Sequence, residues 1–168
     1  MLNIIVCIKQ VPMVSELPWN SKTGTLKREL AEGMMDPASR RALEAALQIK
    51  ENLDANICAV TMGPAMAEEI LHQAKALGAD EGVLLTDRRM AGADTFLTSH
   101  ILSRFIQREY NSFDLVICGS QTSDSETAQV GPQLAEDLGI PAIGYINKIS
   151  VKENTVEVQR HVDDFFET

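Results

Sequence analysis

The sequence contains no apolar run of about 18 residues, the length that a membrane-spanning helix requires. It also shows no leader in which charged residues precede an apolar segment and a cleavage site, because Met1 leads directly into the strand-like stretch LNIIVCI. We therefore expect a cytoplasmic protein with no membrane partner.

Basic residues are few relative to acidic ones. The chain has 15 Lys and Arg against 24 Asp and Glu, a formal net charge of −9 and a pI near 4.8. Nucleic-acid binding needs Lys and Arg concentrated on one face of a protein. The charge balance argues against a nucleic-acid partner and leaves a soluble partner or a small ligand.

Cysteine is rare, and its spacing is not that of a metal site. Cys7, Cys58 and Cys118 each lie in or at the end of an apolar run, and none forms a CxxC pair or a zinc-like cluster. We expect all three to be buried free thiols.

Glycine-dependent nucleotide signatures are absent as well. No GxGxxG follows the first apolar run and no GxxxxGK[ST] occurs, which argues against an ordinary dehydrogenase or P-loop hydrolase. No Ser-His-Asp set and no metal-ligand set can be assembled, so we expect neither a catalytic side chain nor a metal site. The three histidines are expected at the surface or its boundary: His72, His100 and His161.

Four short, nearly continuous apolar runs are present, and they are typical of strands covered on both faces. They span residues 2–8, 56–62, 82–86 and 113–119. Helical apolar periods alternate with them. The alternation predicts one α/β domain over residues 1–168, with a doubly wound, mostly parallel sheet and helices on both faces.

Capping residues predict where the helices begin and end. Asp36 followed by Pro37 is an N-cap and first-turn signature, and Asp94 has the character of a second N-cap. Gly78 and Gly139 follow the last residues of two other helical periods, where glycine commonly ends a helix.

Two segments depart from this alternation. Residues 9–35 form a long polar connection with Pro12, Pro18, Trp19 and Gly24, too long for an ordinary loop and so either functional or mobile. After Pro141, residues 142–151 and 156–162 predict an antiparallel hairpin whose second strand runs straight to the chain end.

The stretch GSQTSDSETAQV, residues 119–130, ends the fourth apolar run with short polar side chains. Successive backbone N–H groups at a helix start can hold a phosphate without a glycine-rich loop, and residues 125–130 supply such a run. The same residues also fit a helix cap, with Ser123 and Glu126 as a capping box. Both interpretations stay open from the residues alone, and Asp124 is assigned to a sugar hydroxyl or to loop structure.

Several stretches, taken in order, resemble the β subunit of the electron transfer flavoproteins. They are IIVCIKQVP, MDPASRRALEAALQIKE, AVTMGPAMAEEILHQAKALGAD, FDLVICGSQTSDSETAQVGPQLAEDLGIP and VEVQRHVDDFFET. The resemblance covers essentially the whole chain, and its most specific part is Gly119 to Pro132. It implies the fold of the adenine-nucleotide α-hydrolases.

The resemblance also implies a set of cofactor-binding residues. Adenine and ribose would lie against Cys7, the turn Asp36, Pro37, Ala38 and Ser39, and Met62. The phosphate would lie against the loop formed by Gly119, Ser120, Gln121, Thr122, Ser123, Asp124, Ser125, Glu126, Thr127, Ala128, Gln129 and Val130.

The cofactor implied is AMP, or a second FAD whose ADP part takes the AMP position, with the redox FAD held mainly by an α subunit. The implied partners are that α subunit and flavin dehydrogenases that donate electrons, so the chain would be an electron-carrier subunit rather than an enzyme. An alternative is a stand-alone adenine-nucleotide sensor of the universal-stress type, although the Gly-rich phosphate loop usual there is missing. A third is a purely structural partner domain.

The chain departs from the family pattern at several positions. The family usually has Asn where this chain has Asp36, and often an acidic residue or Cys where it has Ser39. Ser125 and Glu126 replace a glycine and an aspartate of the bifurcating-type loop. Family members also continue well beyond Thr168, so we expect the chain to be truncated at its C-terminus relative to them.

Overall fold

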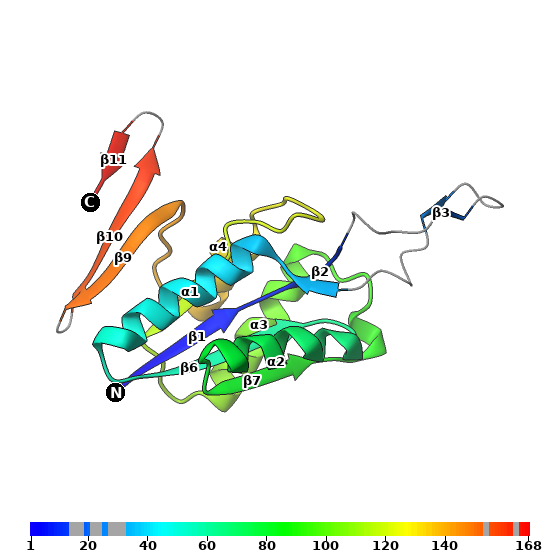
Figure 1. The fold of residues 1–168 in the computed structure, drawn as a ribbon, viewed down its shortest axis with the longest axis horizontal. Coiled ribbons are helices and arrows are strands. Elements are labelled where there is room, and N and C mark those ends of the chain that lie inside the picture. The colour runs from blue at the N-terminus through cyan, green and yellow to red at the C-terminus, as the bar shows by residue number, and fades with distance from the viewer. Residues whose placement is uncertain (14–18, 21–24, 27–32, 153–154, 163–164) are drawn as a thin grey trace.

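The computed structural model describes residues 1–13, 19–20, 25–26, 33–152, 155–162 and 165–168 (Figure 1). Its centre is a four-stranded sheet of β1 (Leu2–Cys7), β6 (Ala55–Met62), β7 (Glu81–Leu85) and β8 (Leu115–Cys118). The strand order is β7-β6-β1-β8 and every pairing is parallel. The four predicted strands and their parallel pairing are confirmed.

Helices cover both faces of this sheet. The helices α1 (Pro37–Asn52) and α2 (Glu68–Leu77) lie on one face, and α3 (Thr95–Glu109) and α4 (Val130–Leu138) lie on the other (Figure 1). Short 3-10 turns, η3 (Ala65–Ala67) and η4 (Arg88–Met90), follow β6 and β7. The doubly wound arrangement is confirmed. Among the described helices, none is long and apolar enough to span a membrane.

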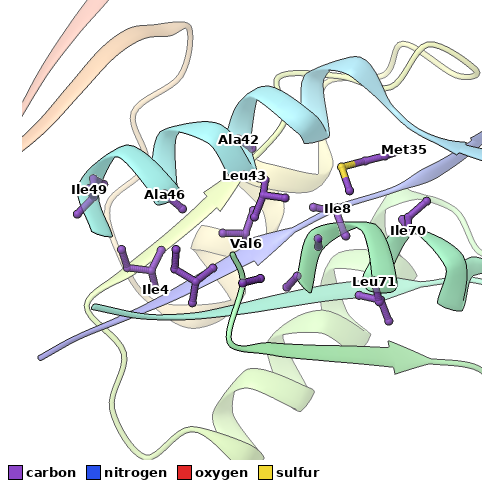
Figure 2. Close-up of a cluster of buried hydrophobic side chains, with 14 of the residues drawn as sticks. Ile4, Val6, Ile8, Met35, Ala42, Leu43, Ala46, Ile49, Ile70 and Leu71 are labelled. Atoms are coloured by element: carbon purple, nitrogen blue, oxygen red, sulfur yellow. The ribbon is translucent and has the colours of Figure 1, made fainter. Parts of the chain in front are cut away.

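The core is divided into two layers by the sheet. Ile4 and Val6 of β1 point toward the side of α1 and α2 and belong to the cluster that also contains Leu43 and Ile70 (Figure 2). Ile5, between them in the sequence, joins the cluster on the α3 and α4 face. Successive side chains of a strand point to opposite faces, which is why an unbroken apolar run fills both layers.

The predicted helix boundaries are confirmed by their capping bonds. Asp36 accepts from the N–H groups of Ala38 and Ser39, and Pro37 occupies the first helical position of α1. Asp94 accepts from Leu97 N–H at the start of α3. Gly78 and Gly139 have positive φ angles of 125° and 69°, which glycine adopts with little strain.

The long connection after β1 contains two short strand pairs. β2 (Gln10–Pro12) pairs antiparallel with β5 (Gly33–Met35), and β3 (Trp19–Asn20) pairs with β4 (Thr25–Leu26). The β2–β5 pair returns the chain to the start of α1. Pro18 and Gly24, which the sequence singled out, lie outside the described residues.

The C-terminal part forms an antiparallel sheet of β9 (Ile146–Lys152), β10 (Thr155–Val162) and β11 (Phe165–Glu167). Ile149 and Val151 of β9 pack against the core cluster of α1. The hairpin is confirmed, and residues 153–154 lie outside the described part. The expectation that the second strand runs to the chain end was wrong, because the chain reverses and β11 pairs with β10.

Candidate functional site

The candidate site lies where the strand order reverses, at the carboxyl ends of β1 and β8. From β1 the chain crosses to β6 and β7 on one side, and β8 returns to pair on the other. Ligands of doubly wound sheets bind in the crevice at such a switch point. Cys7 and Cys118 end the two strands and are register partners, so the residues that follow each strand lie at this edge.

Gly119 allows β8 to end directly against the start of α1. A Cβ atom at Gly119 would lie 2.9 Å from the carbonyl carbon of Ala38 and 3.0 Å from the backbone N of Ser39. These are backbone atoms, which cannot swing away as a side chain could. The contact brings two parts of the predicted site, the turn 36–39 and the loop 119–129, into van der Waals contact.

Asp36 joins the same two parts through hydrogen bonds. Its Oδ2 accepts from Ala38 N–H at 2.9 Å and Ser39 N–H at 3.3 Å, and its Oδ1 accepts from Ser123 N–H at 2.8 Å. The side chain is only 1% exposed. Both carboxylate oxygens are therefore used inside the protein, which explains how a buried acid is tolerated here.

Ser39 is also occupied by a structural contact. Its hydroxyl accepts a hydrogen bond from Lys9 N–H at 3.0 Å, and Asp36 N–H donates to the Lys9 carbonyl at 2.8 Å. Ser39 is buried. The segment that leaves β1 is thus held against the first turn of α1.

The side chain of Lys9 reaches the loop 119–129. Its Nζ lies 2.9 Å from Asp124 Oδ2, and both side chains are partly exposed. Burial alone would raise the pKa of Asp124, but hydrogen bonds from Lys9 and Thr122 outweigh it and the pKa is lowered. Of the two roles considered for Asp124, the structure supports loop structure.

The middle of the loop is a turn closed by its own backbone. The N–H groups of Ser125 and Glu126 both donate to the Thr122 carbonyl, at 3.4 and 2.8 Å, and the Thr122 and Ser125 hydroxyls lie 2.7 Å apart. Glu126 and Ala128 have positive φ angles of 52° and 56°. This conformation brings a Cβ atom close to the following carbonyl oxygen and is disfavoured for residues other than glycine, so the loop holds both residues in a strained backbone conformation.

The capping-box interpretation of Ser123 and Glu126 is wrong. The helix α4 begins at Val130, its N-cap is Gln129, and no side chain caps it. Ser123 instead donates its N–H to Asp36. In a capping box the Glu126 carboxylate would accept from the Ser123 N–H. Asp36, 87 positions away in the sequence, accepts from this N–H instead.

A run of backbone donors follows the turn. The N–H groups of Thr127, Ala128, Gln129, Val130 and Gly131 donate to no other residue among those described. They approach the positive end of α4, and Pro132 next to them has no N–H to offer. Gln129 is fixed by its side chain, whose Oε1 accepts from the Thr95 hydroxyl at 2.9 Å. Consecutive free N–H groups at a helix start are chemically suited to hold an anion.

The remaining predicted residues lie at the same edge. Met62 ends β6, one strand further from β8, and is half-buried. Cys7 and Cys118 are half-buried, so the expectation of full burial is confirmed for Cys58 alone, although all three thiols are free. His72 and His100 are exposed as expected, while the side chain of His161 lies outside the described part.

Sequence reasoning missed two residues that shape the site, Lys9 and Thr95. Lys9 directly follows the first strand, so the rule that ligands bind at the carboxyl ends of strands could have found it. Thr95 gave no such signal. It begins α3, and it contacts Gln129, 34 positions away in the sequence, only in the folded chain.

Comparison with known proteins gives the family. A model of the electron transfer flavoprotein domain matches residues 23–168. The chain belongs to the electron transfer flavoprotein β-subunit family. The chain is 43% identical over 166 residues to the electron transfer flavoprotein subunit beta of Clostridium acetobutylicum. The aligned region covers 99% of this chain and 63% of that protein.

Other relatives carry different names. The chain is 42% identical to the caffeyl-CoA reductase-Etf complex subunit CarD of Acetobacterium woodii, covering 99% of this chain and 63% of that protein. It is 39% identical to protein FixA of Sinorhizobium fredii, covering 96% of this chain and 59% of that protein. The chain therefore spans about 60% of the length of these relatives.

Proposed function

We propose that this chain binds an adenine nucleotide, either AMP or the ADP part of FAD, at the crevice between β1 and β8. The observation that carries the proposal is the run of unpaired N–H groups from Thr127 to Gly131 at the start of α4. The run follows the turn that Asp36 anchors through Ser123. Short side chains in the loop 119–129 leave the donors open to a phosphate.

The charges around the loop fit a nucleotide phosphate. Lys9 is a cation within reach of the loop, and Asp124 holds it there at 2.9 Å. When a phosphate binds, Lys9 can turn from Asp124 toward it, which would offset the negative charge that the loop already carries. The carboxylate of Glu126 would then face solvent, because two acids beside a phosphate repel it.

The adenine and ribose end would be shaped by Cys7, Met62 and the turn 36–39. Both oxygens of Asp36 already accept hydrogen bonds, and the Ser39 hydroxyl already accepts from Lys9 N–H. Asp36 and Ser39 would therefore act as positioning residues that fix the turn, while the backbone of Pro37 and Ala38 would line the crevice.

We further propose that the chain works as the β-type subunit of a flavoprotein electron carrier in the cytoplasm. It would pair with an α subunit that holds most of the redox FAD, and receive electrons from flavin dehydrogenases. Bound FAD would supply the electron-carrying chemistry, and this chain would hold and orient its nucleotide. Family membership and the names of the relatives favour this over a stand-alone sensor.

A thermal-shift series tests the nucleotide proposal. The chain is heated with AMP, ADP, ATP, FAD, FMN or NADH at equal concentration. A ligand at one hundred times its Kd stabilises the folded state by about 2.7 kcal/mol. For a domain of this size this raises the Tm by about 5–10 °C.

AMP and ADP should stabilise the chain about as well as FAD, and FMN should not, since FMN lacks adenine. Stabilisation by FMN without AMP would reject the adenine-nucleotide site. A much larger shift with FAD than with AMP would instead favour a second FAD as the natural ligand.

A further inference from the structure

Cys7 and Cys118 lie side by side at the ends of β1 and β8. They are Cα partners in the parallel register, so their side chains point to the same face of the sheet. Both pack against the cluster beneath α3 and α4. Neighbouring strands are about 4.8 Å apart, which lies inside the Cα separation of about 4.4–6.8 Å that disulfides span.

The two thiols influence each other's ionisation. Their interaction lowers the pKa of Cys118 despite its burial and raises that of Cys7. The start of α4 lies close by, since a Cβ at Gly131 would be 3.6 Å from Cys118 Cβ. A helix N-terminus favours a thiolate in the same direction.

The third cysteine, Cys58 of β6, has Ile5 rather than a cysteine as its register partner on β1. Cys58 is 1% exposed, whereas Cys7 and Cys118 are half-buried at the edge of the sheet. Burial raises the pKa of the Cys58 thiol. We therefore expect a small oxidant to attack the pair before Cys58.

We propose that Cys7 and Cys118 form a dithiol site that a peroxide oxidises to a disulfide linking β1 to β8 at the mouth of the crevice. The Cys118 thiolate attacks one peroxide oxygen, breaks the O–O bond, and becomes a sulfenic acid as the other oxygen leaves as water or alcohol. The Cys7 sulfur then attacks the Cys118 sulfur, forms the S–S bond, and releases the sulfenic oxygen as water. Two thiols lose two electrons and two protons, and the peroxide is reduced.

The disulfide would be readily reversible. Parallel strands hold partner Cβ atoms near the strand separation of about 4.8 Å, somewhat beyond the separation of about 3.5–4.5 Å that a relaxed disulfide prefers. Strained disulfides have more oxidising potentials and are reduced easily. The pair therefore has the properties of a reversible modification site rather than of a permanent cross-link.

The test counts thiols in the full 168-residue chain. The reduced protein is treated with excess hydrogen peroxide, freed of peroxide, denatured, alkylated and weighed by mass spectrometry. Two of the three cysteines should resist alkylation, with a mass loss of two hydrogens, and a peptide containing Cys7 should be linked to one containing Cys118. Dithiothreitol should restore all three thiols.

Three variants make the test specific. Cys58→Ser should lose both remaining thiols to oxidation, and it keeps the proposal testable even if a variant of the pair folds poorly. Cys7→Ser and Cys118→Ser should each form no intramolecular link. The proposal is overturned if the Cys58→Ser chain keeps two alkylatable thiols, if links form only between chains, or if oxidation stops at a sulfinic acid without an S–S bond.

Discussion

The carboxylate of Asp36 accepts a hydrogen bond from the Ser123 N–H at 2.8 Å, although the two residues are 87 positions apart in the chain. The same carboxylate caps α1 through its other oxygen. One buried acid therefore stabilises a helix end and holds the loop that follows β8, and its replacement should affect both.

Asp36→Asn should separate these two roles. An amide has one acceptor oxygen, so it can keep the cap or the bond from Ser123 N–H but not both. Leaving one buried partner unpaired should lower the free energy of unfolding by about 1–3 kcal/mol, measured by urea denaturation.

The matched control is Asp94→Asn at the start of α3, where the carboxylate caps a helix and anchors no loop. Asn and Asp are about equal as N-caps, so this change should be nearly neutral. Equal losses in the two variants would mean that the bond to Ser123 contributes nothing.

Gly119→Ala tests the close approach of β8 to α1. The added methyl group would lie 2.9 Å from the backbone of Ala38, so the loop or the helix must move. We expect a loss of about 1–3 kcal/mol of unfolding free energy, typical of overpacking. Gly144→Ala is the control, because a Cβ there has no atom within 4 Å. If both variants unfold at the same urea concentration, the backbone there adapts freely.

Ala128→Glu tests the proposed phosphate position. A longer, negatively charged side chain beside the N–H groups of the loop should repel an anion while the fold is kept, because Ala128 is not part of the core. Calorimetry should show AMP affinity lower by about tenfold or more, equivalent to about 1.4 kcal/mol. Glu44→Gln, on the exposed side of α1, should bind AMP as the parent chain does. Unchanged affinity in Ala128→Glu would place the phosphate elsewhere.

Acid should weaken the fold partly through Asp80. Lys50 lies 2.6 Å from this carboxylate, and mainly through that hydrogen bond the pKa of Asp80 falls below its usual 3.8. A lowered folded-state pKa gives stability that is present above 3.8 and is lost as the pH falls through the folded value. Asp80→Asn and Lys50→Met should each flatten the fall in unfolding free energy below pH 3.8. The double variant should add little to either single one, and additive effects would show that the pair does not act together.

The isolated chain should purify without colour. The family resemblance assigns most flavin contacts to an α subunit, and the chain has no glycine-rich dinucleotide loop. Its visible absorption should be that of a flavin-free protein, and co-expression with an α subunit should give a yellow complex. A stoichiometric flavin spectrum from the chain alone would indicate that it holds a flavin by itself.

Local signals predicted most of the fold. Asp36 with Pro37, and Gly139 after the last helix, mark helix ends by bonds formed within a few residues, so the sequence contains all the information needed. The apolar runs predicted the strands for the same reason. The end of the chain was misjudged because β11 depends on pairing with β10, which no local pattern in VEVQRHVDDFFET specifies.

The site was harder to predict than the fold. The loop 119–129 was found from its composition, and the family resemblance supplied its ligand. The position of the loop depends on contacts between residues far apart in the sequence: Ser123 with Asp36, and Gln129 with Thr95. The capping box failed there because a distant carboxylate competed with a local one.

These two contacts attach the middle and the C-terminal end of one loop to opposite sides of the sheet. Asp36 belongs to the layer of α1 and α2, and Thr95 to the layer of α3 and α4, whose apolar clusters are otherwise separated by the strands. A ligand that orders the loop would therefore bind to a segment held in place by both layers. Because the loop is held from both layers, loosening either helix terminus should weaken the proposed anion site.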